Sequence, residues 1–403
     1  MTEARQPNRA ALSGMIVAIF LALGLGLASI GPAVNYLMPR WGVLLADGGI
    51  LFTALELGYA GAVLLSGLLL GRLGLRTVAL ACNIAFILGG LVMAFAANLA
   101  AGLLGSALLG VGVGGIAISL NLLTIDLYRE RSNSALNIFN AVFGLGAIAA
   151  PLLVNAALGW FGSLQSHFLL LTAISLLAAL GFAFLRFPEH QAASAGTRVS
   201  LISLLREPYV LLVSLLFFLA IGLEAGYSGW SYVFASKGAQ LDPTATALLV
   251  TTFWLAFTLG RSAAGLVAHW LSAGGVLLCS ALLGGVGAFL VATLGSQPLT
   301  LFVGTALVGF GVGPLFPTAF GLATAYRPAV AASLSAVGMI GGSLGGAILP
   351  YLQGQLLSVS LPLGAAFTGV GMIMVLGLRY ALHQPVNRRP ANQPLPTVGP
   401  EVG

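Results

Sequence analysis

Charged residues are scarce in this sequence. Of its 403 residues, 16 are basic and 10 acidic, which is 6% of the chain, against about 25% in an average soluble domain. Hydrophobic residues make up 59%, and the mean hydropathy is +1.03. So few charges could not cover the surface of a water-soluble fold, and the dominance of apolar residues excludes a disordered chain. The composition therefore predicts a membrane protein.

Cysteine and histidine are also rare, which limits the chemistry that the chain can carry. The two cysteines, Cys82 and Cys279, lie inside apolar runs and show no metal-binding spacing. The four histidines map to loops, helix ends or the tail: His167, His190, His269 and His383. No phosphate-binding Walker loop is present. We therefore expect no metal and no cofactor, and the sequence disfavours both a membrane-embedded enzyme and an ATP-driven pump.

Long apolar runs, by contrast, are abundant. A membrane helix needs about 20 mainly apolar residues, and the runs here are continuous rather than alternating, which favours helices over a closed barrel. The first run is too long for the apolar core of a signal peptide. The sequence thus predicts an all-α membrane protein with twelve transmembrane helices. The predicted spans lie at about residues 13–36, 50–70, 77–97, 101–127, 134–158, 166–186, 208–234, 245–268, 274–294, 299–323, 330–357 and 362–382.

The basic residues predict the orientation. Thirteen of the 16 fall in segments on the side of the two termini, whereas Arg40 and Lys237 fall on the other side and Arg261 falls within a helix. Because cytoplasmic loops carry an excess of Lys and Arg, we expect a multi-pass protein of the plasma (inner) membrane with both termini in the cytoplasm. Single, scattered basic residues also account for the sequence pI of about 9.7 without a nucleic-acid-binding patch.

A polar stretch divides the chain into two halves. Residues 1–186 are predicted to form an N-terminal six-helix half, 187–207 a cytoplasmic linker, and 208–382 a C-terminal six-helix half. The tail, residues 383–403, is rich in proline, asparagine and arginine, and is predicted to be disordered and cytoplasmic.

An internal repeat relates the two halves. Residues 110–114 read GVGVG in helix four, and residues 309–313 read GFGVG in helix ten, 199 residues later. At the same offset Pro151 matches Pro350, and at an offset of 198 Gly24 matches Gly222. Several matches in order at nearly one offset indicate a duplication. A parallel repeat of this kind places the substrate of a transporter at mid-membrane, between the halves.

The segment GLLLGRLGLR (67–76) resembles the loop motif between helices two and three of the major facilitator superfamily, with Gly71 in place of the usual acidic residue. That replacement weakens the gating ion pair which the family motif implies. Four further stretches resemble the fucose-permease-like branch, a group of sugar porters: 119–153, 221–235, 253–265 and 311–325. The resemblance implies the major facilitator fold of two pseudo-symmetric six-helix halves, with one half rocking against the other during transport.

Three positions depart from the family patterns. In the fucose-permease branch, acidic residues on helices one and four look essential for proton-coupled uptake, and they align with Asn35 and Ala117. The arginine that drug/proton antiporters carry early in helix four aligns with Ser106. Since neither signature is complete, proton-coupled uptake, efflux of amphipathic compounds and an uncoupled facilitator all stay open.

Ionisable residues inside the predicted helices are the leading site candidates, because a charge in lipid is costly. Glu224, near the middle of helix seven with Tyr227 on its face, is predicted to couple transport to protons or to bind substrate hydroxyls. Glu56, in the outer part of helix two, is a second proton-coupling candidate or simply reaches interfacial water. Arg261 is expected to snorkel or to pair with a backbone carbonyl, and Asp126 to pair with loop arginines.

Uncharged polar and aromatic residues complete the predicted site, since amides bond to sugar hydroxyls and rings stack on the apolar faces of sugars. The alternative for each aromatic residue is packing between helices. The predicted substrate-binding residues are Asn35, Asn121, Asn140, Glu224, Tyr227, Trp230, Trp254, Phe316 and Gln353. The predicted gating residues are Arg72, Arg76, Arg261 and Asp126.

Together these features predict a secondary active transporter that moves a sugar or similar small polar solute by alternating access, coupled to protons. Efflux of amphipathic compounds and uncoupled facilitation are the alternatives. The expected partners are the solute, membrane lipid and protons, with no nucleic acid, and the chain is expected to act as a monomer. The residues do not indicate which solute is carried or in which direction.

Overall fold

The computed structural model describes residues 8–185, 187, 204–327 and 330–383, and every regular element in those ranges is helical. The long helices are α1 (Arg9–Arg40), α2 (Gly49–Leu73), α3 (Leu75–Phe95), α4 (Leu99–Tyr128), α5 (Ser132–Phe161), α6 (Gln165–Phe184), α8 (Pro208–Val233), α9 (Pro243–Val267), α10 (Ala273–Leu294), α11 (Pro298–Val312), α12 (Leu315–Tyr326), α13 (Ala331–Val359) and α14 (Leu361–His383). Three short helical segments accompany them: η1 (Leu45–Gly48), η2 (Arg129–Arg131) and the π-helix η3 (Phe234–Gly238). Most of the predicted linker and nearly all of the predicted tail lie outside the described residues.

Twelve helical spans in the described ranges are long and apolar enough to cross a membrane. The predicted number and order of spans are therefore confirmed. Helices satisfy their own backbone hydrogen bonds, which lipid cannot do. The tenth span is divided into α11 and α12 at Gly313 and Pro314, because a proline ring lacks the N–H donor and clashes with the preceding turn.

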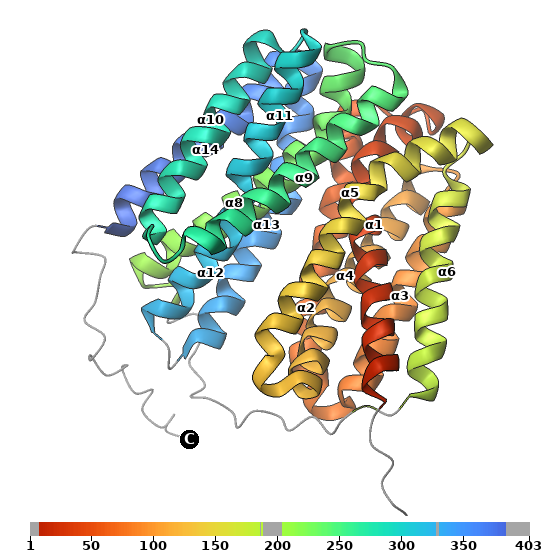
Figure 1. Ribbon diagram of the computed structural model, residues 1–403. Helices are drawn as coiled ribbons and strands as arrows, with labels where there is room; N and C mark the ends of the chain where they lie inside the picture. The colour runs from red at the N-terminus through yellow and green to blue at the C-terminus, as the bar shows by residue number, and fades with distance from the viewer. Residues whose placement is uncertain (1–7, 186, 188–203, 328–329, 384–403) are drawn as a thin grey trace, which may run out of the picture.

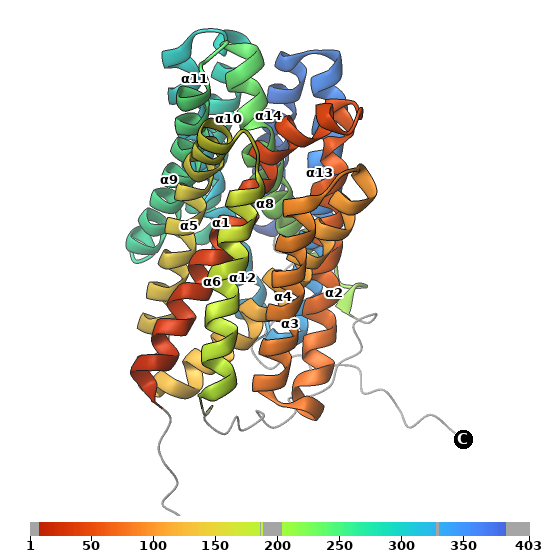
Figure 2. The ribbon, with the colours of Figure 1, turned by 90° about the vertical axis from the view of Figure 1, so that its right-hand side faces the viewer.

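The helices form two bundles that stand side by side (Figure 1). We call α1–α6 the N half and α8–α14 the C half, with α11 and α12 counted as one span. Figure 2 shows the N half in front, with its helices running along the height of the molecule. Because each half crosses six times, the start of α1 and the end of α14 lie on one side, here called the termini side. The opposite side is called the far side.

The repeated glycines pack in the same way in both halves. In 110–114, the first and third glycines lie against the backbone of α2, and the second lies against α3. In 309–313, the first and third glycines lie against the backbone of α9, and the second lies against α10. Glycine is required at these positions because the backbones approach more closely than a Cβ would allow. The matching contacts support the duplication inferred from the sequence.

Replacing Gly110 with alanine is expected to destabilise the fold. The new Cβ would collide with the carbonyl oxygen of Leu55 and force α4 away from α2. Overpacking of this kind costs about 1–3 kcal/mol, and it is measured as a lower midpoint of thermal unfolding in detergent. Gly61→Ala is the matched control, since nothing lies within 4 Å of a Cβ built at Gly61. Equal midpoints for the two variants would contradict this account of the packing.

Contacts between the halves gather toward the far side. The Thr53 hydroxyl, near the start of α2, donates a hydrogen bond to the carbonyl oxygen of Ala347 in α13 at 2.6 Å. Gly31 in α1 lies against the backbone of Gly229 in α8. Toward the termini side the ribbons of the two halves diverge (Figure 1). The far side is therefore where the halves are joined in this conformation.

Candidate functional site

A small central pocket lies where the two halves meet. Its volume is about 40 Å³, and it is lined by Leu27, Phe52, Leu55, Glu56, Ile221, Glu224, Ala225, Ser228 and Trp254. Two pairs of these residues, Leu27 with Ala225 and Glu56 with Trp254, are related by the 198-residue offset of the repeat. The two halves therefore contribute equivalent positions to one pocket.

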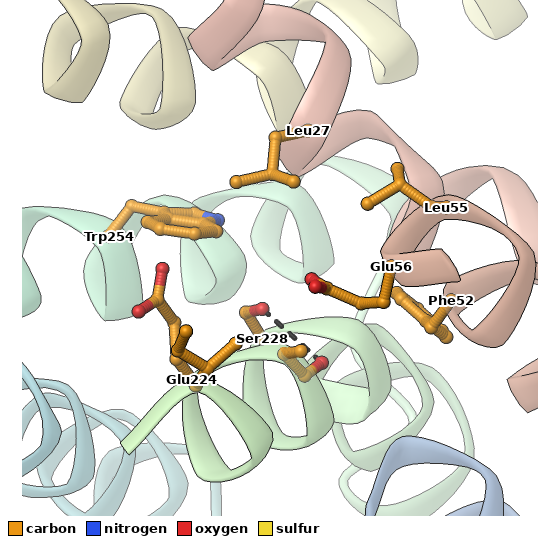
Figure 3. A pocket seen from close by; sticks show the side chains of 9 residues that line it. Leu27, Phe52, Leu55, Glu56, Glu224, Ser228 and Trp254 are labelled. Atoms are coloured by element: carbon orange, nitrogen blue, oxygen red, sulfur yellow. Dashed lines mark hydrogen bonds between the residues drawn. The ribbon is translucent and has the colours of Figure 1, made fainter. Parts of the chain in front are cut away.

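Both acidic residues predicted to couple transport line this pocket. Figure 3 shows the carboxyl groups of Glu56 and Glu224 pointing into the same space from opposite sides, with Trp254 and Leu27 beside them. Glu56 comes from α2 in the N half and Glu224 from α8 in the C half. Any movement of one half against the other therefore changes the separation of the two acids.

Glu224 is positioned by the close packing of α8. Gly222 and Gly226 flank it and allow α8 to lie tightly against α13. The Oε2 atom of Glu224 lies 3.9 Å from Nη2 of Arg261 in α9, and the two side chains are 18% and 41% exposed, respectively. Glu224 is thus an acid with one cationic partner, and that partner keeps an accessible face.

Arg261 is anchored by the break between α11 and α12. Its Nε donates to the carbonyl oxygen of Gly313 at 3.2 Å, which confirms the predicted pairing with a backbone carbonyl. Pro314 follows this glycine, and the last carbonyls of a helix lack partners within the helix. The guanidinium also lies 4.5 Å from the centre of the Phe257 ring, a cation–π contact. The broken helix therefore supplies the acceptor that holds Arg261 in place.

Glu56 is buried rather than interfacial. Its exposed fraction is 7%, and its carboxyl lies against Gly346 of α13, where a Cβ would come within 2.7 Å of Glu56 Cδ. Across the described ranges, no hydrogen bond or ion pair to this carboxyl is found. The alternative in which Glu56 reaches interfacial water is contradicted, because α13 of the other half covers this part of α2.

A larger cavity of about 310 Å³ lies between α5 and α9, toward the termini side of the central pocket. It is lined by Asn137, Asn140, Ala141, Phe143, Gly144, Trp254, Phe257, Thr258, Arg261, Ser262 and Gly265. Trp254 lines both spaces and so forms the wall between them. Its indole Nε1 is buried and has no hydrogen-bond partner in the part of the chain that is described. This N–H is a free donor at the junction of the two spaces.

The cavity wall combines amides, hydroxyls, a guanidinium and aromatic rings. Asn140, a predicted substrate-binding residue, lines it from α5 together with Asn137. Sequence reasoning did not select Thr258 and Ser262. The signal that could have found them is helical spacing, because one face of α9 presents residues i, i+4, i+7, i+8 and i+11. These are Trp254, Thr258, Arg261, Ser262 and Gly265.

Three predicted substrate-binding residues line neither cavity and have their polar groups bonded within the C half. The buried Tyr227 hydroxyl hydrogen bonds with a threonine hydroxyl of α11 at 2.8 Å. Trp230 Nε1 donates to the carbonyl oxygen of Pro350 at 2.7 Å, and Gln353 Nε2 donates to the carbonyl oxygen of Gly364 at 2.8 Å. The structure does not bring these three to a solute cavity, because their polar groups already connect neighbouring helices.

Asn35, Asn121 and Phe316 also lie outside the linings of the two cavities. The Asn35 Nδ2 and Asn121 Oδ1 atoms are buried without a hydrogen-bond partner among the described residues. The Phe316 ring packs edge-on against Phe217, with ring centroids 5.5 Å apart. Solute contact by these three residues stays a prediction.

The predicted gating residues occupy two regions. Arg261 lies at the central site, whereas Arg72 at the end of α2, Arg76 at the start of α3 and Asp126 near the end of α4 lie toward the termini side. Arg76 donates to the carbonyl oxygen of Ala183, which fastens α3 to α6 within the N half. A gating role for these residues stays a prediction.

Twelve apolar spans in two equivalent halves, with cavities at and beside their junction that carry ionisable and polar side chains, define a membrane transport protein. The family model of the Major Facilitator Superfamily matches residues 15–350, and the chain belongs to this family. The resemblance drawn from the motif at 67–76 is confirmed. Because this is a family of transporters, the chain is an integral, multi-pass transporter and not an enzyme.

Relatives across most of the chain carry transporter names. The sodium-dependent glucose transporter 1A of Mus musculus is 23% identical over 374 residues, which covers 84% of this chain and 88% of the relative. The glucose/mannose transporter GlcP of Bacillus subtilis is 24% identical over 390 residues, which covers 89% of this chain and 91% of the relative.

Solved structures share the fold. The nucleoside transporter NupG has a TM-score of 0.79 at 12% identity and covers 93% of this chain and 100% of its own. The fucose:proton symporter FucP of E. coli has a TM-score of 0.63 at 17% identity, covering 93% of this chain and 98% of its own. At such identities the similarity shows the fold alone.

Proposed function

We propose that this protein is a secondary transporter that moves a sugar, or a similar small polar solute, together with protons by alternating access. The observation that carries the proposal is the pair of acids, Glu56 and Glu224, one from each half, in a pocket that adjoins a polar cavity. Ionisable groups within membrane spans are costly and mark substrate or ion pathways. We therefore assign coupling to these two acids.

The cavity between α5 and α9 suits a sugar. Its volume of about 310 Å³ lies at the lower end of the roughly 300–1,000 Å³ of small-molecule sites. Its amides and hydroxyls can bond to several solute hydroxyls, and Trp254 and Phe257 offer rings for apolar sugar faces. The names of the mouse and Bacillus relatives support the same solute class. We assign solute contact to Asn140, Trp254 and Arg261.

Protons are the coupling ion that the central pocket favours. Two carboxyl groups line one small pocket, and Glu224 can exchange a proton while Arg261 lies beside it as a counter-ion for its charged form. Sodium is the alternative that the names of several relatives suggest, and transport assays distinguish the two ions.

We further propose that the termini side faces the cytoplasm and that the chain lies in the plasma (inner) membrane as a monomer. The support for orientation is the excess of basic residues on that side of the sequence. The support for a monomer is that both halves of one chain line the central pocket. In this orientation the larger cavity lies toward the cytoplasm from the central pocket.

Uptake into proteoliposomes tests the proposal. With a higher proton concentration outside, radiolabelled D-glucose or another sugar of a panel is expected to accumulate inside above its external concentration. A sodium gradient at equal pH on both sides is expected to drive no accumulation. Protein-free liposomes under the same gradients are the control.

Each other outcome points to a defined alternative. Accumulation driven by sodium alone would replace the proton as the coupling ion. Equilibration of the sugar that neither gradient changes would identify an uncoupled facilitator. Proton-driven efflux of amphipathic dyes, with no flux of any sugar, would contradict the proposed solute class.

A further inference from the structure

We infer that Arg261 links the solute cavity to Glu224, such that protonation of Glu224 releases the guanidinium to bind the solute. This inference rests on the proposed function and deepens it by naming the residue through which proton binding and solute binding influence each other. It gives Arg261 a coupling role in place of the gating role expected from the sequence.

Arg261 is the cationic link between the two spaces. It lines the larger cavity, while its Nη2 lies 3.9 Å from Oε2 of Glu224, which lines the central pocket. Its Nε is already held by the Gly313 carbonyl, so only the terminal nitrogens have to exchange partners. With a side chain that is 41% exposed, the guanidinium remains accessible from the cavity.

The contact between Arg261 and Glu224 is loose enough to exchange. At 3.9 Å it is longer than the roughly 2.7–2.9 Å of a charge-assisted hydrogen bond. When Glu224 is ionised, it competes with the solute for the guanidinium. When Glu224 is protonated, Arg261 has no counter-ion there, and its N–H groups are available to solute oxygens.

The remaining ionisable groups around Glu224 do not offer a second cation. They are Glu56 and Tyr59 on α2 and Tyr227 on α8. Glu56 is an acid, and the two tyrosines are neutral hydroxyls. Within the described ranges, Arg261 is therefore the cationic group that responds to the charge of Glu224.

The sign of the coupling follows from this arrangement. Protonation of Glu224 favours solute binding, and by reciprocity a bound solute favours the protonated form. Solute and proton therefore load together, which is what symport requires. A facilitator built on the same fold would show no such linkage.

Equilibrium binding of D-glucose to the full-length protein in detergent tests the inference. The wild-type Kd is expected to be about tenfold lower at about pH 6 than at about pH 8, within the roughly 5- to 150-fold range of typical couplings. Arg261→Gln is expected to bind more weakly and to lose this difference. Glu224→Gln imitates the protonated acid and is expected to bind at both pH values as tightly as the acidified wild type.

A matched control removes an arginine from a different ion pair of the same half. Arg327 Nη1 lies 2.9 Å from Oε1 of Glu207, and neither residue lines the two cavities. Arg327→Gln is expected to keep the wild-type pH dependence.

The outcomes separate this inference from the proposed function. A pH dependence that persists in Arg261→Gln would overturn the inference and leave proton-coupled sugar transport standing. Wild-type protein that binds neither D-glucose nor any other sugar of the panel, or binds its sugar equally at both pH values, would overturn both. If Arg261→Gln does not fold, Glu224→Gln decides: weak binding at about pH 8 would contradict the release of Arg261.

Discussion

A cross-link between positions 53 and 347 is expected to abolish transport. In a background without Cys82 and Cys279, Thr53→Cys and Ala347→Cys place two thiols across the α2–α13 interface, where the Thr53 hydroxyl lies 2.6 Å from the Ala347 carbonyl oxygen. Alternating access requires the halves to separate here before the cavity can open to the far side. Oxidised protein should therefore take up no more solute than protein-free liposomes, and a reductant should restore uptake.

The control for this experiment is a cross-link within one half. Ser66 in α2 hydrogen bonds to Cys82 in α3, so Ser66→Cys with the native Cys82 joins two helices that move together. That cross-link is expected to leave uptake unchanged. Undiminished uptake by protein in which mass spectrometry finds the 53–347 link complete would contradict rocking of the halves at this interface.

The fold was predictable because a bilayer permits few solutions. Backbone groups in lipid must bond within the chain, so each long apolar run, such as the one that becomes α8 (Pro208–Val233), had to be a helix. The glycines of 110–114 and 309–313 revealed the duplication because only small residues allow such close packing. The same reasoning did not predict that the Glu56 side chain is buried, since the helix that covers it, α13, is almost 300 residues away in the sequence.

The direction in which side chains point was the harder problem. In a helix of a soluble protein, polar residues mark the side that faces water. Around α8, both the lipid and the neighbouring helices are apolar, so polarity does not show which of them a side chain faces. Tyr227 follows Glu224 by three residues and is therefore rotated by about 60° around the helix. That rotation is enough to turn its hydroxyl toward α11. Sequence reasoning singled out Glu224 and Arg261 separately, because the cost of burying charge restricts such residues more strongly, but it did not predict that the two side chains lie 3.9 Å apart.

Glu224→Gln is expected to eliminate accumulation driven by the pH gradient. If one proton moves with each solute, a gradient of two pH units can sustain accumulation of about 100-fold, since each unit corresponds to a factor of ten. Glutamine keeps the shape and hydrogen-bonding capacity of the side chain but cannot carry the proton. The variant should therefore bring the solute only to equal concentrations on both sides.

Exchange of labelled for unlabelled solute distinguishes a lost coupling step from a lost binding site. Exchange does not require a net proton movement, so Glu224→Gln is expected to retain it while accumulation disappears. Glu207→Gln is the matched control, because Glu207 directly precedes α8 but pairs with Arg327 outside the cavities. If Glu56→Gln abolished accumulation while Glu224→Gln preserved it, the coupling acid would be Glu56. Loss of both exchange and accumulation in Glu224→Gln would instead make Glu224 a binding residue. A carboxyl group that only carries the proton is not needed for exchange, because no net proton moves during exchange.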